Sequence, residues 1–172
     1  MKYFFYILVL TVLFFGCSDD PKPQPQLSMA EIQEALLDAN INAAKLESEQ
    51  IDSYVKEKEL NVIKTGTGLR YVIYKKGEGI VVPEGNSKVA ISYSITLLDG
   101  TACYSTEGNP EELIIGKSYA ESGLQEALTY MKEGDKATVI IPSHLAHGLA
   151  GDLKKIPIRA TIVYDVEVVK VK

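Results

Sequence analysis

Residues 88 to 98 (KVAISYSITLL) alternate between apolar and polar side chains, the pattern of a β-strand with one buried face. Asp99 and Gly100 follow, a pair that favours the tight turn of a hairpin, and the segment TACYST comes directly after them. These residues predict two antiparallel strands. The segments KATVIIP (136–142) and RATIVYDVEVVKVK (159–172) also have the composition of strands.

Shorter segments complete the prediction for residues 60 to 172. NVIK and LRYVIYKKG flank the turn TGTG and predict a second hairpin, ELIIG predicts a short strand, and residues 121 to 131 predict a helix. TGTG lacks the strand, spacing and following helix of a dinucleotide loop, so we do not expect it to bind phosphate. The expected fold class is α+β, with an antiparallel sheet of five to six strands and one short helix.

Residues 28 to 59 predict a long helical extension before this domain. Ser28 and Glu31 have the spacing of a capping box, and a stripe of apolar residues follows at spacings of four and three. The stripe consists of Ile32, Leu36, Ala39, Ala43 and Leu46, and it continues loosely to Gln50, Tyr54 and Val55. A stripe this narrow could pack on the following domain or on a second copy of itself in a homodimer, and the sequence does not decide between them.

Residues 1 to 16 are expected to be an export signal. Their apolar run, residues 3 to 15, is too short to cross a hydrocarbon core of about 30 Å. The run ends in Gly16 and Cys17 and resembles a bacterial lipoprotein signal, in which the cysteine is lipidated after cleavage. The alternative is an export signal that merely ends in cysteine. A proline-rich tether over residues 17 to 27 would follow, with the protein lipid-anchored in the cell envelope, at the periplasmic face or the outer-membrane surface.

Three further kinds of site are not expected. The formal net charge of −5 disfavours a nucleic-acid surface, which needs clustered Lys and Arg. His144 and His147 have no third ligand nearby in the sequence, so no metal site is predicted. Glu111 and Glu121 would suit the carboxylate pair of a hydrolase, but no other feature supports that chemistry.

Four segments in one order resemble the FKBP-type peptidyl-prolyl cis-trans isomerases. They are ISYSITLLDGTACYST, ELIIGK, SGLQEALTYMKEGDKATVIIPSHLAHG and IPIRATIVYDVEVVKV, and the resemblance covers residues 68 to 172. It corresponds to the family's V-x-Y-x-G-x-x-x-DG-x-x-F-D-S strand, its F-x-L-G, its helix and IP-x-x-x-A-Y-G loop, and its IPP-x-x-x-L-x-F-D-V-E-L strand. The resemblance implies a twisted sheet wrapped around the short helix, with a shallow pocket for a proline side chain and no cofactor.

The resemblance also implies the residues of that pocket. Catalytic positions are Tyr93, Ile156, Tyr164 and Glu121, the last through its backbone N–H, which in the family binds the substrate carbonyl. Further substrate-binding positions are Cys103, Tyr104, Leu113, Ala120, Leu124 and His147. The family has Phe at the position of Cys103 and of Glu111, Trp at that of Leu124 and Tyr at that of His147. These losses of aromatic surface predict weak activity, since they remove apolar contact with the proline.

Two functions follow from the resemblance. The first is an isomerase that acts on X-Pro bonds of exported proteins as they fold, where uncatalysed isomerisation takes tens to hundreds of seconds. The second is a non-catalytic module that binds a client or a partner in the cell envelope. The replaced pocket residues are the feature that separates the two.

Overall fold

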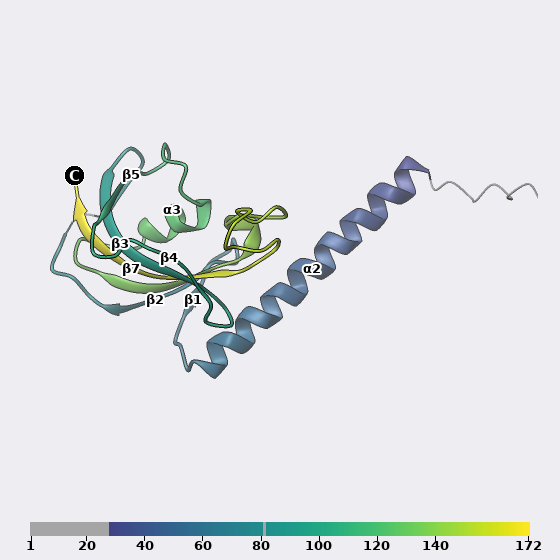
Figure 1. The fold of residues 1–172 in the computed structure, drawn as a ribbon, viewed down its shortest axis with the longest axis horizontal. Coiled ribbons are helices and arrows are strands. Elements are labelled where there is room, and N and C mark those ends of the chain that lie inside the picture. Colours follow the sequence, from purple (N-terminus) through teal and green to yellow (C-terminus); the bar gives the residue numbers. More distant parts are fainter. Residues whose placement is uncertain (1–27, 81) are drawn as a thin grey trace, which may run out of the picture. The chain divides into compact units, whose positions relative to one another are not determined.

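The computed structural model describes residues 28–80 and 82–172 (Figure 1). The chain divides into two compact units, with the boundary between Ala39 and Asn40. The predicted export signal, the tether and Cys17 lie outside the described residues. None of the helices in the described part of the chain has the length and apolar character needed to cross a membrane.

The sheet of the second unit has seven antiparallel strands. In chain order they are β1 (Ile63–Lys64), β2 (Arg70–Lys75), β3 (Lys88–Leu97), β4 (Ala102–Ser105), β5 (Glu111–Ile114), β6 (Lys136–Ile141) and β7 (Ile162–Val171). Their spatial order is β1-β2-β6-β7-β3-β4, and β5 lies off this order and pairs with β3. Every predicted strand segment is present, but the predicted count of five to six is too low because the short strands β1, β4 and β5 are all paired.

Both predicted hairpins are confirmed. In the β3–β4 turn, the Gly100 N–H donates to the Leu97 carbonyl at 3.0 Å, and Gly100 has φ +86°, a conformation that side chains disfavour. In the other hairpin, Ile63 lies opposite Tyr71. The turn chemistry in the sequence was therefore sufficient to place these pairs.

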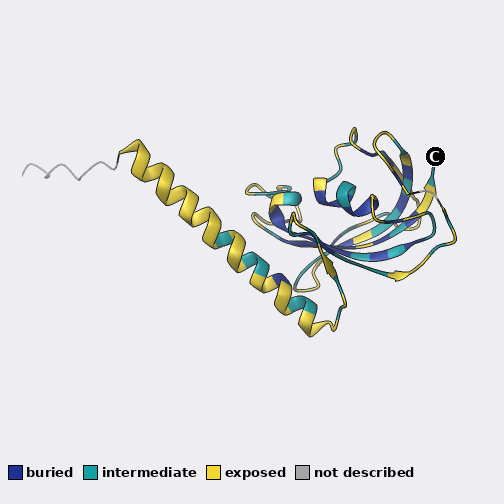
Figure 2. Ribbon diagram, turned by 180° about the vertical axis from the view of Figure 1, so that it is seen from behind, coloured by how far each residue is buried: buried dark blue, intermediate teal, exposed yellow. Residues whose placement is uncertain are grey.

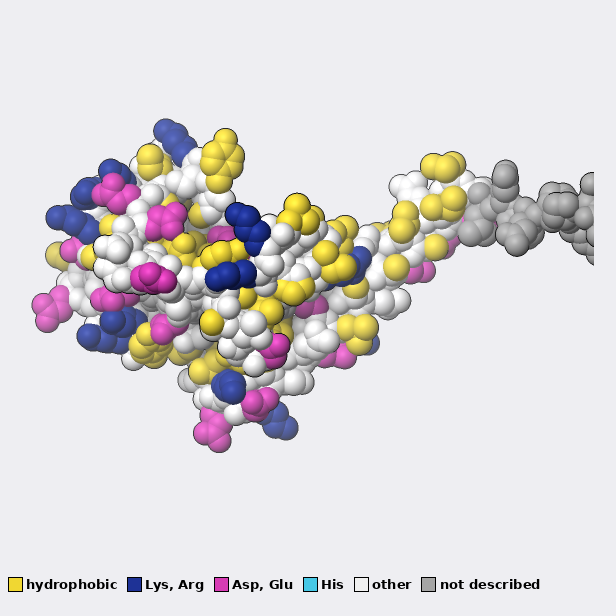
Figure 3. Space-filling view, viewed as in Figure 1, with side chains coloured by type: hydrophobic (Ala, Val, Ile, Leu, Met, Phe, Trp, Pro, Cys, Tyr) yellow, Lys and Arg dark blue, Asp and Glu magenta, His cyan; other side chains and the backbone are white. Residues whose placement is uncertain are grey.

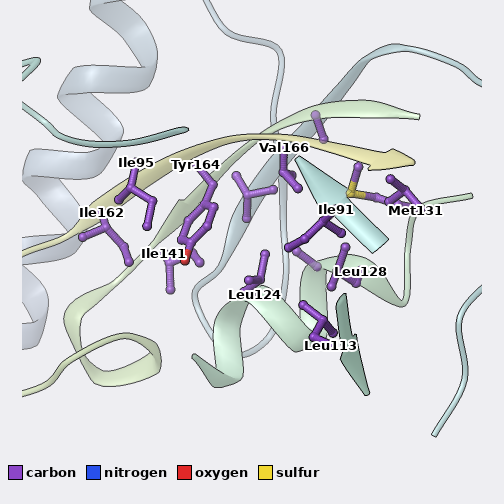
Figure 4. Close-up of a cluster of buried hydrophobic side chains, with 14 of the residues drawn as sticks. Ile91, Ile95, Leu113, Leu124, Leu128, Met131, Ile141, Ile162, Tyr164 and Val166 are labelled. Atoms are coloured by element: carbon purple, nitrogen blue, oxygen red, sulfur yellow. The ribbon is translucent and has the colours of Figure 1, made fainter. Parts of the chain in front are cut away.

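The sheet curves around the helix α3 (Ser122–Leu128), and the main core lies between them (Figure 1). Leu124 and Leu128 extend from α3 toward the sheet, where they meet side chains such as Ile91 and Ile141 (Figure 4). The approach is close at Gly123, where an added Cβ would lie 2.4 Å from Cγ2 of Ile141. The predicted α+β fold, with a sheet around one short helix, is confirmed.

The long helix α2 (Met29–Glu57) begins with the predicted capping box. The Ser28 N–H donates to Glu31 Oε2 at 2.7 Å, and the Glu31 N–H donates to Ser28 Oγ at 3.3 Å. Most of α2 is exposed, and buried or half-buried positions occur in its C-terminal half (Figure 2). Ile32, Leu36 and Leu46 of the stripe are exposed. Figure 3 shows hydrophobic side chains on the surface of the helix.

Within the second unit, the C-terminal part of α2 packs on the sheet face opposite α3. Ile51 is fully buried against Ile140 and Val163, and Tyr54 and Val55 pack beside it. Burying one isoleucine side chain contributes about 1.5–3 kcal/mol. Part of the extension expected over residues 28–59 thus packs on the domain expected over residues 60–172, through a residue outside the predicted stripe.

Polar contacts reinforce this packing. Arg70 is only 2% exposed, and its guanidinium donates to Asp52 Oδ1 at 2.7 Å and to Ser48 Oγ at 2.8 Å. Glu47 accepts hydrogen bonds from the Ser143 N–H and the Thr161 hydroxyl, both at 2.7 Å. Because a buried guanidinium without partners is costly, these bonds make the C-terminal part of α2 a component of the second unit.

Candidate functional site

A cavity of about 630 Å³ lies beside the N-terminal end of α3. Its lining comes from β3, β4 and β5, from residues 118–121, from the loop of residues 147–154, and from Tyr164 on β7. The buried members of this lining are apolar or aromatic: Ile91, Ile95, Leu113, Leu124 and Tyr164. The cavity therefore has an apolar interior that could hold a small hydrophobic ring.

Two tyrosines on neighbouring strands form one wall of the cavity. The rings of Tyr93 and Tyr164 are 5.3 Å apart between centroids and tilted by 55°. Each hydroxyl donates to a carboxylate: Tyr93 to Glu111 Oε2 at 2.7 Å, and Tyr164 to Glu121 Oε2 at 3.0 Å. Burial, together with these carboxylates, raises the pKa of both phenols well above the ordinary value, so both are neutral donors at neutral pH.

A third tyrosine is arranged in the same way on the opposite rim. The Tyr104 hydroxyl donates to Asp152 Oδ2. Oδ1 of the same carboxylate accepts the N–H groups of Lys154 at 2.9 Å and Ile156 at 2.8 Å. The bond from Tyr104 and these N–H groups hold the pKa of Asp152 well below its usual range, while the bond to Asp152 raises the pKa of Tyr104.

Glu121 connects the helix to the cavity. It is the N-cap of α3, with φ −54° and ψ 140°, and its side chain lies between Tyr164 and His147, whose Nε2 is 3.0 Å from Glu121 Oε1. Within residues 28–80 and 82–172, its backbone N–H donates no hydrogen bond. A helix-terminal N–H at a cavity edge is a suitable donor for a ligand carbonyl.

Eight of the ten predicted pocket residues line this one cavity. They are Tyr93, Tyr104, Leu113, Ala120, Glu121, Leu124, His147 and Tyr164. Cys103 and Ile156 do not line it: they are 2% and 3% exposed and belong to the core. Burial raises the pKa of the Cys103 thiol.

The histidines and the glutamate pair considered in the sequence each have separate partners. His144 Nε2 lies 3.0 Å from the Thr67 carbonyl oxygen, whereas His147 contacts Glu121. Glu111 and Glu121 each accept a bond from a different tyrosine. In the described part of the chain, no three His, Cys, Asp or Glu side chains are grouped so as to hold a metal ion.

Asp152 and Lys154 are lining residues that the sequence did not indicate. They lie in a loop between η1 (Ser143–Leu145) and β7, without apolar periodicity, and only the folded chain brings them to Tyr104. An aspartate whose side chain accepts a backbone N–H two residues later is a common turn feature, so Asp152 gives no specific signal in the sequence.

Comparison with known proteins identifies the family. Residues 81–169 match the sequence profile of the family described as FKBP-type peptidyl-prolyl cis-trans isomerase. The chain is 30% identical to the FKBP-type peptidyl-prolyl cis-trans isomerase FkpA of Buchnera aphidicola subsp. Schizaphis graminum, an alignment that covers 93% of this chain and 68% of the relative. It is 31% identical to FkpA of Escherichia coli K12, over 93% of this chain and 63% of that relative.

The fold agrees with these sequence matches. The crystal structure of FkpA from Escherichia coli superposes with a TM-score of 0.60 at 32% identity, covering 86% of this chain and 74% of that one. The chain thus spans about two thirds of the length of both curated relatives. Profile, identity and fold lead to the same conclusion, and the chain belongs to the FKBP-type peptidyl-prolyl cis-trans isomerase family.

Proposed function

We propose that the chain catalyses cis-trans isomerisation of X-Pro bonds in exported proteins as they fold. The observation that carries this proposal is the cavity with an apolar interior, at whose edge the Glu121 N–H has no acceptor among the described residues. Peptide rotation has a barrier of about 18–20 kcal/mol because the amide loses its resonance when it twists. An acceleration of about 10⁴ requires only about 5.5 kcal/mol of preferential binding to the twisted amide.

The cavity residues supply this preference without an acid or a nucleophile. Leu113, Leu124 and the Tyr164 ring would hold the proline ring away from water. The Glu121 N–H would bind a flanking carbonyl and fix the peptide while the amide rotates. A dry environment disfavours the charge-separated resonance form of the planar amide, and thereby favours the twisted one.

The proposed location is the bacterial cell envelope, with lipid on Cys17 as the anchor. Support comes from the apolar run that ends in Gly16 and Cys17, and from the FkpA relatives. Replacing Cys17 by Ala is expected to abolish incorporation of labelled fatty acid and to release the protein or leave it as an uncleaved precursor. Equal labelling of variant and wild type would disprove the anchor.

The experiment for the folding role uses a client whose refolding is limited by an X-Pro bond. The full chain should accelerate the slow refolding phase in proportion to its concentration. A Tyr93→Ala variant should lose most of this effect, because Tyr93 forms a cavity wall. If wild type binds the unfolded client without accelerating the phase, the second function, a non-catalytic binding module, replaces the first.

A further inference from the structure

The charge of the cavity lining is unbalanced toward acid. Apart from its tyrosines, its ionisable members are four carboxylates, one histidine and one lysine: Glu111, Glu112, Glu121, Asp152, His147 and Lys154. Glu112 is neutralised by two cations, Lys88 Nζ at 2.5 Å and Lys172 Nζ at 2.9 Å. Glu111, Glu121 and Asp152 are therefore the lining carboxylates that these two lysines do not neutralise, and the lining itself contributes one lysine, Lys154.

The hydrogen bonds from tyrosine hydroxyls bring no positive charge to Glu111 and Glu121. Glu111 accepts from the Tyr93 hydroxyl, and in the described part of the chain it has no ion pair. Glu121 accepts from the Tyr164 hydroxyl and contacts His147, and its side chain is 15% exposed. The tyrosine hydroxyls orient the two carboxylates as neutral donors and supply no positive charge.

The two carboxylates are linked through one wall of the cavity. Their tyrosine partners, Tyr93 and Tyr164, have ring centroids only 5.3 Å apart. Both acids raise the pKa of both tyrosines through their charge, as expected when all four groups share one small space. When a peptide places its proline ring against this wall, the peptide residues next to the proline lie within the electrostatic field of the two carboxylates.

From this arrangement we infer that the enzyme prefers prolines next to a lysine or arginine, with Glu111 and Glu121 as the residues that determine this specificity. This inference rests on the proposed function and specifies its substrate class. A cationic neighbour gains attraction to the two carboxylates, whereas an acidic neighbour meets repulsion from them. Lys154 opposes the preference, since it is the one lysine of the lining.

The test measures isomerisation by NMR exchange spectroscopy on peptides that differ only beside the proline. One series places Lys, Leu or Glu before the proline, and a second places the same residues after it. In at least one series the full chain should give a kcat/KM about tenfold higher for Lys than for Glu, with Leu between them. The ratio should shrink between about 20 mM and 500 mM salt, because ions screen the attraction.

Isosteric variants assign the preference to residues. Glu111→Gln and Glu121→Gln keep an oxygen that accepts from Tyr93 or Tyr164, and each should reduce the Lys-to-Glu ratio by about threefold. Lys154→Gln should increase it. Glu78→Gln makes the same change of charge at an exposed position outside the cavity and should leave the ratio unchanged.

The outcomes separate the two claims. Equal acceleration of Lys, Leu and Glu peptides would overturn the specificity and leave the isomerase intact, as would a ratio that Glu78→Gln changes as much as Glu111→Gln. If no peptide is accelerated, the isomerase proposal falls. The specificity is then decided by NMR titration of the cavity resonances, in which tighter binding of the Lys-Pro peptide supports it and equal binding refutes it.

Discussion

At the scale of single residues, this cavity is built from tyrosine–carboxylate pairs. Glu111 stands where the family has an aromatic residue, and it accepts a hydrogen bond from Tyr93. Tyr164 takes the place of a phenylalanine, and its hydroxyl donates to Glu121. The half-buried hydroxyl of Tyr93 and the hydroxyl of the buried Tyr164 are therefore each satisfied by a carboxylate. The resemblance could identify these positions, but it could not predict the pairs, because the partners are 18 and 43 residues apart in the chain.

The contribution of the Tyr164 hydroxyl to stability and activity can be tested at neutral pH. Tyr164→Phe keeps the ring that lines the cavity and removes only the bond to Glu121. The free energy of unfolding should fall by about 1.5–3 kcal/mol, as for a hydrogen bond to a charged group, and kcat/KM should stay within about threefold of wild type. Urea unfolding and the peptide exchange assay measure these quantities. A loss of activity above tenfold would mean that the hydroxyl takes part in the reaction.

The same hydroxyl should make the stability of the folded protein depend on pH in the alkaline range. The pKa of Tyr164 is raised in the folded state, so its contribution to stability is complete below the unfolded value of 10 and is lost as the pH rises above 10. Wild type should lose stability between about pH 10 and 11, and Tyr164→Phe should lose less over the same interval. Parallel losses in the two proteins would contradict the raised pKa.

At the scale of elements, the sequence predicted what its local patterns encode. The alternation of residues 88 to 98 and the Asp99-Gly100 turn placed β3 and β4, and the capping box placed the start of α2. The sequence analysis did not predict that β6 and β7 are covered on both faces. Residues 139 to 141 and residues 162 and 163 are nevertheless continuously apolar. Such runs are typical of strands buried on both sides, and the covering element is α2.

The position of α3 depends on Gly123, which has no side chain and lies at the contact of the helix with β6. Gly123→Ala would place a Cβ 2.4 Å from Ile141, so the helix must shift away from the sheet. The expected cost is about 1–3 kcal/mol of unfolding free energy, with reduced kcat/KM, because Glu121 and Leu124 move with the helix. Thermal unfolding and the exchange assay provide the measurements.

A matched change on the same helix controls for helix propensity. Ser122→Ala lies at an exposed position of α3, where alanine should cost less than Gly123→Ala. If Gly123→Ala is as stable and active as wild type, the close contact does not fix the helix.

At the scale of the whole molecule, α2 has two parts with different roles. Residues 40 to 57 belong to the compact unit of the domain, where Ile51 and the partners of Arg70 bury the outer sheet face. The apolar stripe that predicted either domain packing or a homodimer did not include Ile51. Its loose continuation did include Tyr54 and Val55, which pack beside Ile51. The sequence did not single out Ile51 itself, because that contact depends on which helix face meets Ile140 and Val163.

Two deletions separate these parts. Removing residues 28–58 exposes Ile140 and Val163 and leaves Arg70 without Asp52, so the melting temperature should fall by more than 10 °C. Removing residues 28–39 should leave the domain folded, with a melting temperature within a few degrees of wild type. Calorimetry measures both, and an equally stable domain after the longer deletion would contradict the assignment of α2 to the fold.

The shorter deletion also tests the homodimer, which remains a proposal. The exposed side chains of Ile32, Leu36 and Leu37 support it. If α2 joins two copies, sedimentation should give twice the chain mass for wild type and a reduced mass after removal of residues 28–39. A monomer mass in both proteins would reject the dimer.

The central claim is that this cavity isomerises X-Pro bonds, and NMR exchange spectroscopy on a short X-Pro peptide measures it directly. Wild type should produce cis-trans exchange at least tenfold faster than the uncatalysed peptide. Tyr93→Ala should reduce this rate by at least tenfold, whereas Tyr74→Ala, which removes an exposed tyrosine outside the cavity, should not. Exchange no faster than in the free peptide, or equal exchange with Tyr93→Ala, would contradict the account.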